Sequence, residues 1–271
     1  MKKAFLTGIN QYPDPRNVLR GCINDIHDMA EFLQKERGFD EANIRLLQDA
    51  AATKENILNG LQWLLQDAAA GDQLFFQYSG HGAQMPTLST NGEPDRLDEV
   101  ICPYDFNWTD ATALKDKEFN KLFASIPAGV SFIWVSDSCH SQDLSREVNL
   151  ADNGIFKMRS MQPPPDIAQR TIKVKASPKL KVQELAAIAP ALNLALISGC
   201  KSNQESADAV FKKRANGALT YFLLQALHSA NGKTRSLRSL VTQVNEQLRK
   251  IKYPQQPQVE GNKTLMEGVF F

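Results

Sequence analysis

Hydrophobic residues along the chain form two kinds of pattern: short runs typical of buried strands, and longer stretches with helical spacing. The short runs predict strands at residues 4–9, 44–47, 73–78, 131–135 and 194–198. Apolar residues three and four positions apart predict helices at residues 24–37, 54–70, 116–125, 217–230 and 236–250. This alternation indicates an α/β fold with a mostly parallel sheet, and right-handed crossovers place helices on both of its faces.

The pattern is weaker near the C-terminus and in two internal segments. A last short strand falls at residues 257–260 or 266–270, and the pattern does not choose between them. Residues 85–108 are rich in Pro, Gly, Asp and Asn, and residues 144–181 contain three consecutive prolines, so neither segment predicts regular structure. A loop as long as the second is usually functional or disordered. We find no internal repeat, and expect one domain over residues 1–271 with this long irregular loop.

Composition and charge argue against several classes of function. The 31 Lys and Arg residues nearly balance the 30 Asp and Glu residues, so no overall field favours a nucleic acid or an anionic membrane. No apolar run approaches the roughly 18 residues that suggest a membrane span, and the interrupted N-terminal run predicts a strand rather than a signal peptide. The four cysteines form no CxxC pair, which argues against a disulfide framework or a structural zinc site. We therefore expect a cytoplasmic protein whose function depends on a local site.

Two short motifs follow buried strands and carry reactive side chains. The run QLFFQYSGHG places His81 just past the carboxyl end of one strand, and the run FIWVSDSCHS places Cys139 in the same position on another. In an open parallel sheet, sites gather at the carboxyl ends of the strands, so these two residues can meet despite their separation in the sequence. The glycines on either side of His81 allow a sharp turn there.

A thiol beside an imidazole predicts nucleophilic chemistry. The imidazole orients or deprotonates a thiol that is only slightly ionised at neutral pH, and the backbone N–H groups of Gly82 and Cys139 are candidates to hold the oxyanion of a tetrahedral intermediate. The alternative is a buried structural Cys139 and a loop histidine, which the strand and small-residue context disfavours. His140 is a weaker candidate for the base, because adjacent residues ordinarily point in different directions; its alternative role is to orient the loop.

With these two motifs, the sequence resembles the metacaspases and their bacterial relatives, the orthocaspases, within the caspase-like superfamily. Further segments occur in family order over nearly the whole chain: GINQY at 8–12, LRGCINDI at 19–26, LDEVICPYD at 97–105, ISGCKSNQESAD at 197–208 and GALTYFLLQAL at 217–227. The resemblance implies a caspase-like three-layer α/β/α sandwich on a six-stranded sheet. It also implies a thiol protease with a dyad of Cys139 and His81, an acyl-enzyme and no organic cofactor.

The resemblance further implies an acidic pocket that binds arginine or lysine at the cleaved position of a protein or peptide substrate. The family's pocket positions correspond here to Asp25, Ser79 and Asp137. Two carboxylates beside the nucleophile suit a guanidinium or ammonium group that would otherwise be buried unpaired. The alternatives are an N-cap role for Asp25 and a strand-end acceptor role for Asp137.

Two features depart from the family pattern. Gln142 stands where the family usually has glycine, and it favours the alternative that the chain is a catalytically impaired caspase-like scaffold that binds a partner protein. Many members also need calcium, for which Asp95, Asp98 and Glu99 are weak candidates. The region after the cysteine adds few acids, so the cluster of oxygen donors is incomplete, and a solvated loop face is the plainer role.

The sequence therefore predicts a monomeric cysteine endopeptidase that cleaves after Arg or Lys. An esterase or transpeptidase that uses the same dyad is a third interpretation. Basic residues of the long loop match the expected specificity, so we expect self-cleavage within residues 156–181; a plain disordered insertion is the alternative. These basic residues are Lys157, Arg159, Arg170, Lys173, Lys175, Lys179 and Lys181.

Overall fold

The chain is built on a six-stranded sheet with the strand order β14-β11-β7-β3-β1-β2. The computed structural model describes residues 1–88, 94–140, 148–150, 154–175, 182–183, 193–201, 204–229 and 234–271. The strands of the central sheet are β1 (Lys2–Gly8), β2 (Ile44–Gln48), β3 (Gln73–Ser79), β7 (Ser131–Asp137), β11 (Ala195–Ser198) and β14 (Gln258–Gly261). Neighbouring strands are parallel except that β14 runs antiparallel to β11. The predicted mostly parallel, six-stranded sheet is confirmed.

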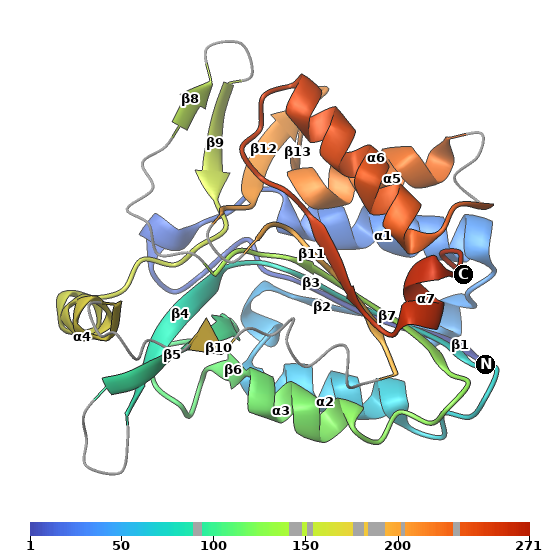
Figure 1. Ribbon diagram of the computed structural model, residues 1–271, viewed down its shortest axis with the longest axis horizontal. Helices are drawn as coiled ribbons and strands as arrows, with labels where there is room; N and C mark the ends of the chain where they lie inside the picture. The colour runs from blue at the N-terminus through green and yellow to red at the C-terminus, as the bar shows by residue number, and fades with distance from the viewer. Residues whose placement is uncertain are drawn as a thin grey trace.

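Helices cover both faces of this sheet, which gives the predicted α/β/α sandwich (Figure 1). Helices α1 (Cys22–Arg37), α5 (Ala218–His228) and α6 (Leu237–Lys250) lie on one face. Helices α2 (Lys54–Leu65) and α3 (Asp116–Phe123) lie on the other, and the short α7 (Lys263–Glu267) lies beside β14. Parallel strands need crossovers, and the helices that make them bury their apolar sides against the sheet.

The core alternates strictly across the sheet because successive side chains of a strand point to opposite faces. Phe5, Phe76 and Trp134 form one row on the face of α2 and α3, in register on β1, β3 and β7. Their rings are 5.7 Å apart at each step of the row. On the opposite face, Leu6 and Val135 pack beneath α1, α5 and α6.

Two smaller sheets extend from the end of the central sheet opposite the N-terminus (Figure 1). One contains β4 (Gly82–Leu88), β5 (Pro94–Ile101), β6 (Leu114–Lys115) and β10 (Val182–Gln183). The other contains β8 (Val148–Leu150), β9 (Gly154–Met158), β12 (Ala207–Phe211) and β13 (Arg214–Gly217). Helix α4 (Pro165–Lys175) contacts the first of them.

The expectation that residues 85–108 and 144–181 lack regular structure is therefore wrong in part. Strands β4 and β5 pair along their whole length although their sequences carry proline and several acids. Strand β9 pairs with β12, which follows it by about fifty residues. These pairings are long-range, and a local pattern does not contain them. The third consecutive proline begins α4, where a missing N–H costs no hydrogen bond.

Element boundaries differ modestly from those expected. The last strand is β14, and the other candidate, residues 266–270, begins within α7, which covers residues 263–267. Helix α2 ends at Leu65 rather than at residue 70, and Asp67 just beyond it has a positive φ of 61°. A left-handed residue just past the last turn is a common end of a helix.

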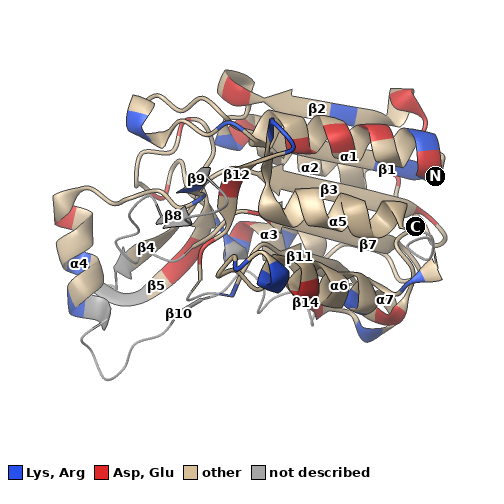
Figure 2. Ribbon diagram, turned by 90° about the horizontal axis from the view of Figure 1, so that it is seen from above, with Lys and Arg blue, Asp and Glu red and all other residues tan. Residues whose placement is uncertain are grey.

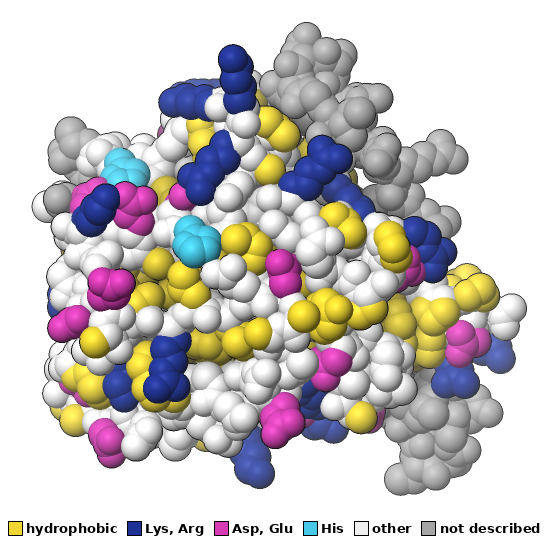
Figure 3. All heavy atoms as spheres, turned by 180° about the vertical axis from the view of Figure 1, so that it is seen from behind, with side chains coloured by type: hydrophobic (Ala, Val, Ile, Leu, Met, Phe, Trp, Pro, Cys, Tyr) yellow, Lys and Arg dark blue, Asp and Glu magenta, His cyan; other side chains and the backbone are white. Residues whose placement is uncertain are grey.

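Charged side chains of both signs are interspersed over the described surface. Figure 2 shows Lys, Arg, Asp and Glu mixed along the helices, and Figure 3 shows no large area of one sign on the face seen from behind. This distribution agrees with the balanced composition. No helix among the described residues is long and apolar enough to cross a membrane.

The contact between α2 and β1 makes the sign of one substitution predictable. A Cβ on Gly60 would lie 2.2 Å from Cζ of Phe5. In an open helix Gly→Ala stabilises by up to about 1 kcal/mol, but here we expect Gly60→Ala to lower the free energy of unfolding by about 1–3 kcal/mol because the site is already filled. Urea unfolding measures this. In a Phe5→Leu background the same change should cost less, and a Gly60→Ala protein more stable than wild type would contradict the packing described.

Candidate active site

The side chains of the two motifs lie at one edge of the central sheet. Strands β3 and β7 are parallel neighbours, and Ser79 at the end of one is in register with Asp137 at the end of the other. His81 and Cys139 each follow two residues later. Both are buried, with exposed fractions of 1% and 0%. The prediction that two strand ends bring these motifs to the same edge is confirmed.

The imidazole of His81 is fixed by contacts that define its tautomer. Its Nε2 lies 2.8 Å from the backbone carbonyl of Asn17. A carbonyl only accepts hydrogen bonds, so Nε2 carries the proton and Nδ1 keeps its lone pair as the basic nitrogen. The hydroxyl of Tyr12 accepts from the His81 N–H, and the hydroxyl of Tyr78 donates to the His81 carbonyl. Burial lowers the pKa of His81 to about 3, so the ring is neutral in this closed arrangement.

Two backbone N–H groups converge on one carbonyl oxygen beside these side chains. The N–H groups of Gly82 and Cys139 both donate to the carbonyl of Arg159, at 2.9 and 3.2 Å. Two donors aimed at one oxygen form the arrangement that stabilises a developing oxyanion. These are the two residues that the sequence pattern suggested for that role.

The guanidinium of Arg159 occupies an acidic pocket next to the same edge. Its Nη2 lies 2.7 Å from Asp25 and 2.9 Å from Asp208, and its Nη1 lies 3.3 Å from the Asp137 carboxylate. Nη1 also donates to the Asp137 carbonyl at 3.0 Å. Arg159 has an exposed fraction of 0%. Three carboxylates therefore surround one cation, and the pocket carries an excess of negative charge.

Other donors hold the carboxylate of Asp137 in place. Its Oδ1 accepts from the Ser206 hydroxyl at 2.8 Å, and its Oδ2 accepts from the N–H and hydroxyl of Thr220. Thr220 lies in the first turn of α5, so the carboxylate also faces the positive end of that helix. A Cβ on Gly217 would lie 2.2 Å from Oδ2, and glycine is the residue that allows this approach.

The other two carboxylates are held by backbone groups. Asp25 accepts from the Gly217 N–H and the Asn216 side chain, and Asp208 accepts from the N–H groups of Gly21 and Arg20. Burial raises the pKa of Asp25 to about 7, although the guanidinium of Arg159 favours its charged form. The pocket is thus a desolvated anionic site that depends on a cation.

Comparison with known proteins assigns this arrangement to a family. A family model described as metacaspase, peptidase C14 domain, matches residues 2–146. The chain is 31% identical to metacaspase-1 of Botryotinia fuckeliana, over 100% of this chain and 70% of that protein. It belongs to the metacaspase family. It is accordingly a caspase-like, cysteine-type endopeptidase.

Further comparisons agree with this assignment. Metacaspase-1B of Neurospora crassa is 30% identical over 99% of the chain and 68% of its own length. A crystal structure of a Geobacter sulfurreducens protein matches with a TM-score of 0.70 and 29% identity, and covers 100% of this chain and 98% of that one. Caspase-1 of Spodoptera frugiperda matches with a TM-score of 0.57, 12% identity and coverage of 96% and 86%. The last similarity shows the caspase fold.

The remaining predicted site residues of this metacaspase lie around the same edge of the sheet or outside the described residues. Ser79 is buried at the end of β3, where its hydroxyl accepts from the side-chain amide of Gln77. The N-cap of α1 is Gly21, so the alternative N-cap role for Asp25 is wrong. His140 is bonded through Nδ1 to the Val100 carbonyl at 3.1 Å, which agrees with a loop-orienting role. Gln142 lies outside the described residues.

Two of the three weak calcium candidates, Asp98 and Glu99, have described side chains, and both are buried. Asp98 is buried and paired with Lys115 at 3.2 Å, Glu99 is buried in the same strand, and the side chain of Asp95 lies outside the described part. Among the described residues, no group of three or more His, Cys, Asp or Glu side chains is placed to hold a metal ion. The described side chains of Asp98 and Glu99 therefore do not by themselves form a calcium site. Calcium activation stays an untested prediction.

Sequence reasoning missed three contributors to the site. Asp208 ends a segment that the family resemblance included, but its carboxylate reaches the pocket only because β12 lies beside β9. Arg159 was one of several basic residues in the long loop, without a signal that singled it out. Asn17 contributes a backbone carbonyl, and its side chain gives no indication of that role.

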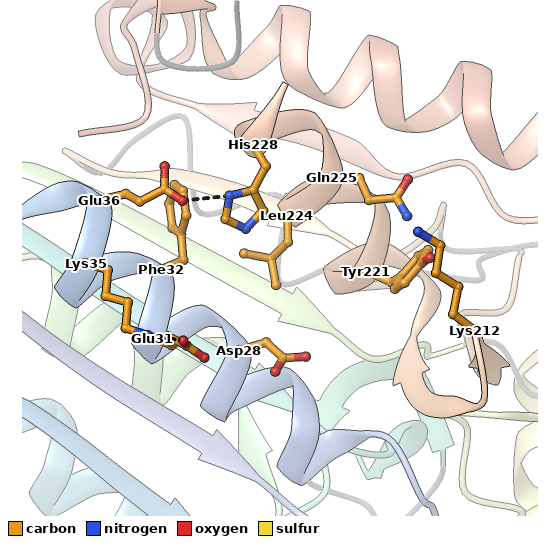
Figure 4. Close-up of a pocket in the computed structure, with 10 residues that line it drawn as sticks. All are labelled: Asp28, Glu31, Phe32, Lys35, Glu36, Lys212, Tyr221, Leu224, Gln225 and His228. Atoms are coloured by element: carbon orange, nitrogen blue, oxygen red, sulfur yellow. Dashed lines mark hydrogen bonds and ion pairs between the residues drawn. The ribbon is translucent and has the colours of Figure 1, made fainter. Parts of the chain in front are cut away.

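A separate hollow lies between α1 and α5 and contains none of these groups (Figure 4). Asp28, Glu31 and Glu36 line it from α1, and His228 from α5 is bonded to Glu36 at 2.7 Å. Lys212 approaches from the other end. Its acidic side chains are engaged within the protein: Asp28 pairs with Arg214, Glu31 with Lys35 and Glu36 with His228.

Burial of His81 predicts a pH dependence of stability. Its folded-state pKa of about 3 lies below the ordinary value near 6.5, so below pH 6.5 the unfolded chain binds a proton that the folded chain excludes. The free energy of unfolding should therefore fall as the pH drops from about 6.5 towards 3, by about 1.4 kcal/mol per pH unit from this residue. The difference between wild type and His81→Gln should change by about 2–3 kcal/mol between pH 6.5 and 4.5 in urea unfolding. The exposed His27, changed to Gln, is the matched control; parallel curves for His81→Gln would contradict the assignment.

Proposed function

We propose that this metacaspase cleaves peptide bonds after arginine or lysine, with Cys139 as nucleophile and His81 as its catalytic partner. The observation that carries the proposal is the buried trio of Asp25, Asp137 and Asp208 around a guanidinium, next to the candidate nucleophile. The side chain that such a pocket selects is a long cation, because its carboxylates are otherwise desolvated without compensation. A bidentate guanidinium fits this geometry better than a single ammonium group.

The proposed reaction follows from the tautomer of His81 and from the N–H donors of Gly82 and Cys139. His81 Nδ1 takes the proton of the Cys139 thiol, and the thiolate attacks the substrate carbonyl carbon. The oxyanion accepts hydrogen bonds from the N–H groups of Gly82 and Cys139. The protonated His81 then gives its proton to the leaving amine, and water hydrolyses the thioester. Because Nε2 is bonded to the Asn17 carbonyl, the ring keeps one orientation throughout these proton transfers.

Removal of either member of the dyad should abolish turnover. We expect Cys139→Ala and His81→Ala each to lower kcat for an arginyl peptide substrate by at least about 1,000-fold while the circular dichroism spectrum and the unfolding transition are preserved. Cys102→Ala, which removes another buried thiol, is the matched control and should keep most of the activity. Near wild-type turnover by Cys139→Ala would reject the proposal. The scaffold alternative instead predicts that wild-type Cys139 does not react with an arginyl acyloxymethylketone.

Loss of one pocket charge should weaken selection for arginine. Asp137→Asn keeps the shape and removes a charge from a desolvated group, so kcat/KM for an arginyl substrate should fall by about 30-fold to several thousand-fold. Asp25→Asn should act in the same direction. Asp28→Asn is the matched control, since it lies one turn further along α1 and pairs with Arg214. Matched Arg, Lys, Gln and Asp substrates decide the matter, and equal turnover of Arg and Gln substrates by wild type would reject the acidic pocket.

A further inference from the structure

A surface hollow lies directly beside the imidazole of His81. Its volume is about 590 Å³, and its lining includes Tyr12, Asn17, Phe106 and Trp108. Two of these residues also hold His81: the Asn17 carbonyl accepts from Nε2 at 2.8 Å, and the ring of Tyr12 lies 4.9 Å from the imidazole. The hollow is therefore continuous with the candidate active site, on the side of the residue proposed to carry the proton.

The walls of this hollow are mainly apolar. Phe106 is buried and Trp108 is half-buried, and their rings lie 5.1 Å apart. Both come from the segment between β5 and β6, whereas Tyr12 comes from the segment between β1 and α1. The charged side chains of the lining, Asp14 and Arg16, pair with each other at 2.6 Å and so neutralise one another. The hollow thus suits an apolar side chain.

Trp108 is held in an unusual backbone conformation. Its φ of 67° lies in the left-handed region, which is costly for a bulky side chain. The Thr109 N–H donates to the side-chain oxygen of Asn107 at 3.2 Å, and the Asn107 N–H donates to the Thr112 hydroxyl at 3.1 Å. The chain is thus fixed on both sides of the tryptophan. Strained residues of this kind cluster at ligand sites, where the surrounding structure imposes the strain.

The register of the chain shows which substrate residue reaches this hollow. The Arg159 carbonyl accepts from the N–H groups of Gly82 and Cys139, which are the donors proposed for the substrate carbonyl. Counted from that carbonyl, Met161 is the second residue, and its buried side chain lines the hollow. The Met161 N–H donates to the Gly82 carbonyl at 2.9 Å, so the backbone runs past Gly82 on its way there. A peptide that follows this path brings its second residue after the cleaved bond to the hollow.

We propose that this hollow is a subsite for the leaving side of the substrate, and that it binds a large apolar side chain at the second residue after the cleaved bond. This inference rests on the proposed function and adds a second determinant of specificity to the acidic pocket. The leaving amine lies beside His81, because the protonated imidazole gives it its proton, and the residues that follow the amine therefore lie near the same ring. Tyr12, Phe106 and Trp108 belong to the segments after β1 and β5, so these walls do not depend on Met161.

Binding at this subsite is measured by kcat/KM. This constant reports the steps up to the acyl-enzyme, during which the leaving part of the peptide is still attached. A leucine or phenylalanine side chain that leaves water for an apolar site binds better than alanine, whereas an aspartate would lose its hydration there. One side of the hollow is open to water, so we expect a difference of at least about 10-fold between leucine and alanine rather than the full effect of burial.

The first test needs only the wild-type chain and five peptides. The peptides share one arginine and the serine after it, and they differ at the next residue, which is Leu, Met, Phe, Ala or Asp. We expect kcat/KM for the Leu, Met and Phe peptides to be at least about 10-fold above that for the Ala peptide, with the Asp peptide below it. Any feature of the protein that limits access to the site acts on all five peptides and cancels in the ratios. Equal values, or a preference for Asp, would overturn the subsite.

Substitution of Trp108 assigns the preference to the hollow. Trp108→Ala should lower the ratio of kcat/KM between the Leu and Ala peptides to about 1–3-fold, whereas Trp108→Phe keeps an aromatic ring and should retain most of the ratio. Trp108→Gly relieves the left-handed strain, guards against misfolding of the Ala variant and should show the same loss. Trp63→Ala is the matched control, since it removes a half-buried tryptophan that packs on Lys3 at the amino end of β1; its ratio should stay that of wild type. An undiminished ratio in both Trp108→Ala and Trp108→Gly would rule out the hollow as the source.

The failure of this inference is distinguishable from that of the proposed function. If the wild-type chain cleaves all five peptides after arginine at equal kcat/KM, the subsite is wrong and the arginine-specific peptidase stands. If it cleaves none of them and Cys139 does not react with an arginyl acyloxymethylketone, the proposed function fails and the subsite fails with it.

Discussion

One buried ionic cluster organises the functional end of the molecule. Arg159 joins carboxylates from α1, β7 and β12, three elements that are far apart in the sequence. Charges removed from water are tolerated only when partners replace the lost hydration, and each of these carboxylates has backbone or side-chain donors in addition to the guanidinium. The start of α5, Gly217 and the pairing of β9 with β12 all contribute to this cluster.

The cluster explains why pocket and fold cannot be separated in this protein. Three buried carboxylates need a compensating cation, because their mutual repulsion and their desolvation add up. In this chain the guanidinium of Arg159 is that cation. The same electrostatics that would select a basic substrate therefore also stabilise the folded chain.

Membership of the metacaspase family defines the class of chemistry, and the fold of this chain brings the reactive segments together. The parallel pairing of β3 and β7 brings both reactive segments to one edge of the sheet, and hydrogen bonds with the hydroxyls of Tyr12 and Tyr78 hold the backbone of His81. The site is thus preorganised before any substrate arrives.

The sequence by itself determined the central sheet, its main helices and the two reactive side chains. Buried parallel strands are short, continuous apolar runs, and residues just past their carboxyl ends meet at one edge of the sheet. His81 and Cys139 can therefore be identified from the local pattern. The motifs, through the family resemblance, also pointed to Asp25 and Asp137. The hairpin of β4 and β5, the third carboxylate of Asp208 and the internal cation of Arg159 were decided by tertiary structure alone. Strand pairing at the sheet edge and ion pairing between distant residues depend on which segments the folded chain brings together. The periodicity of the sequence does not contain this information.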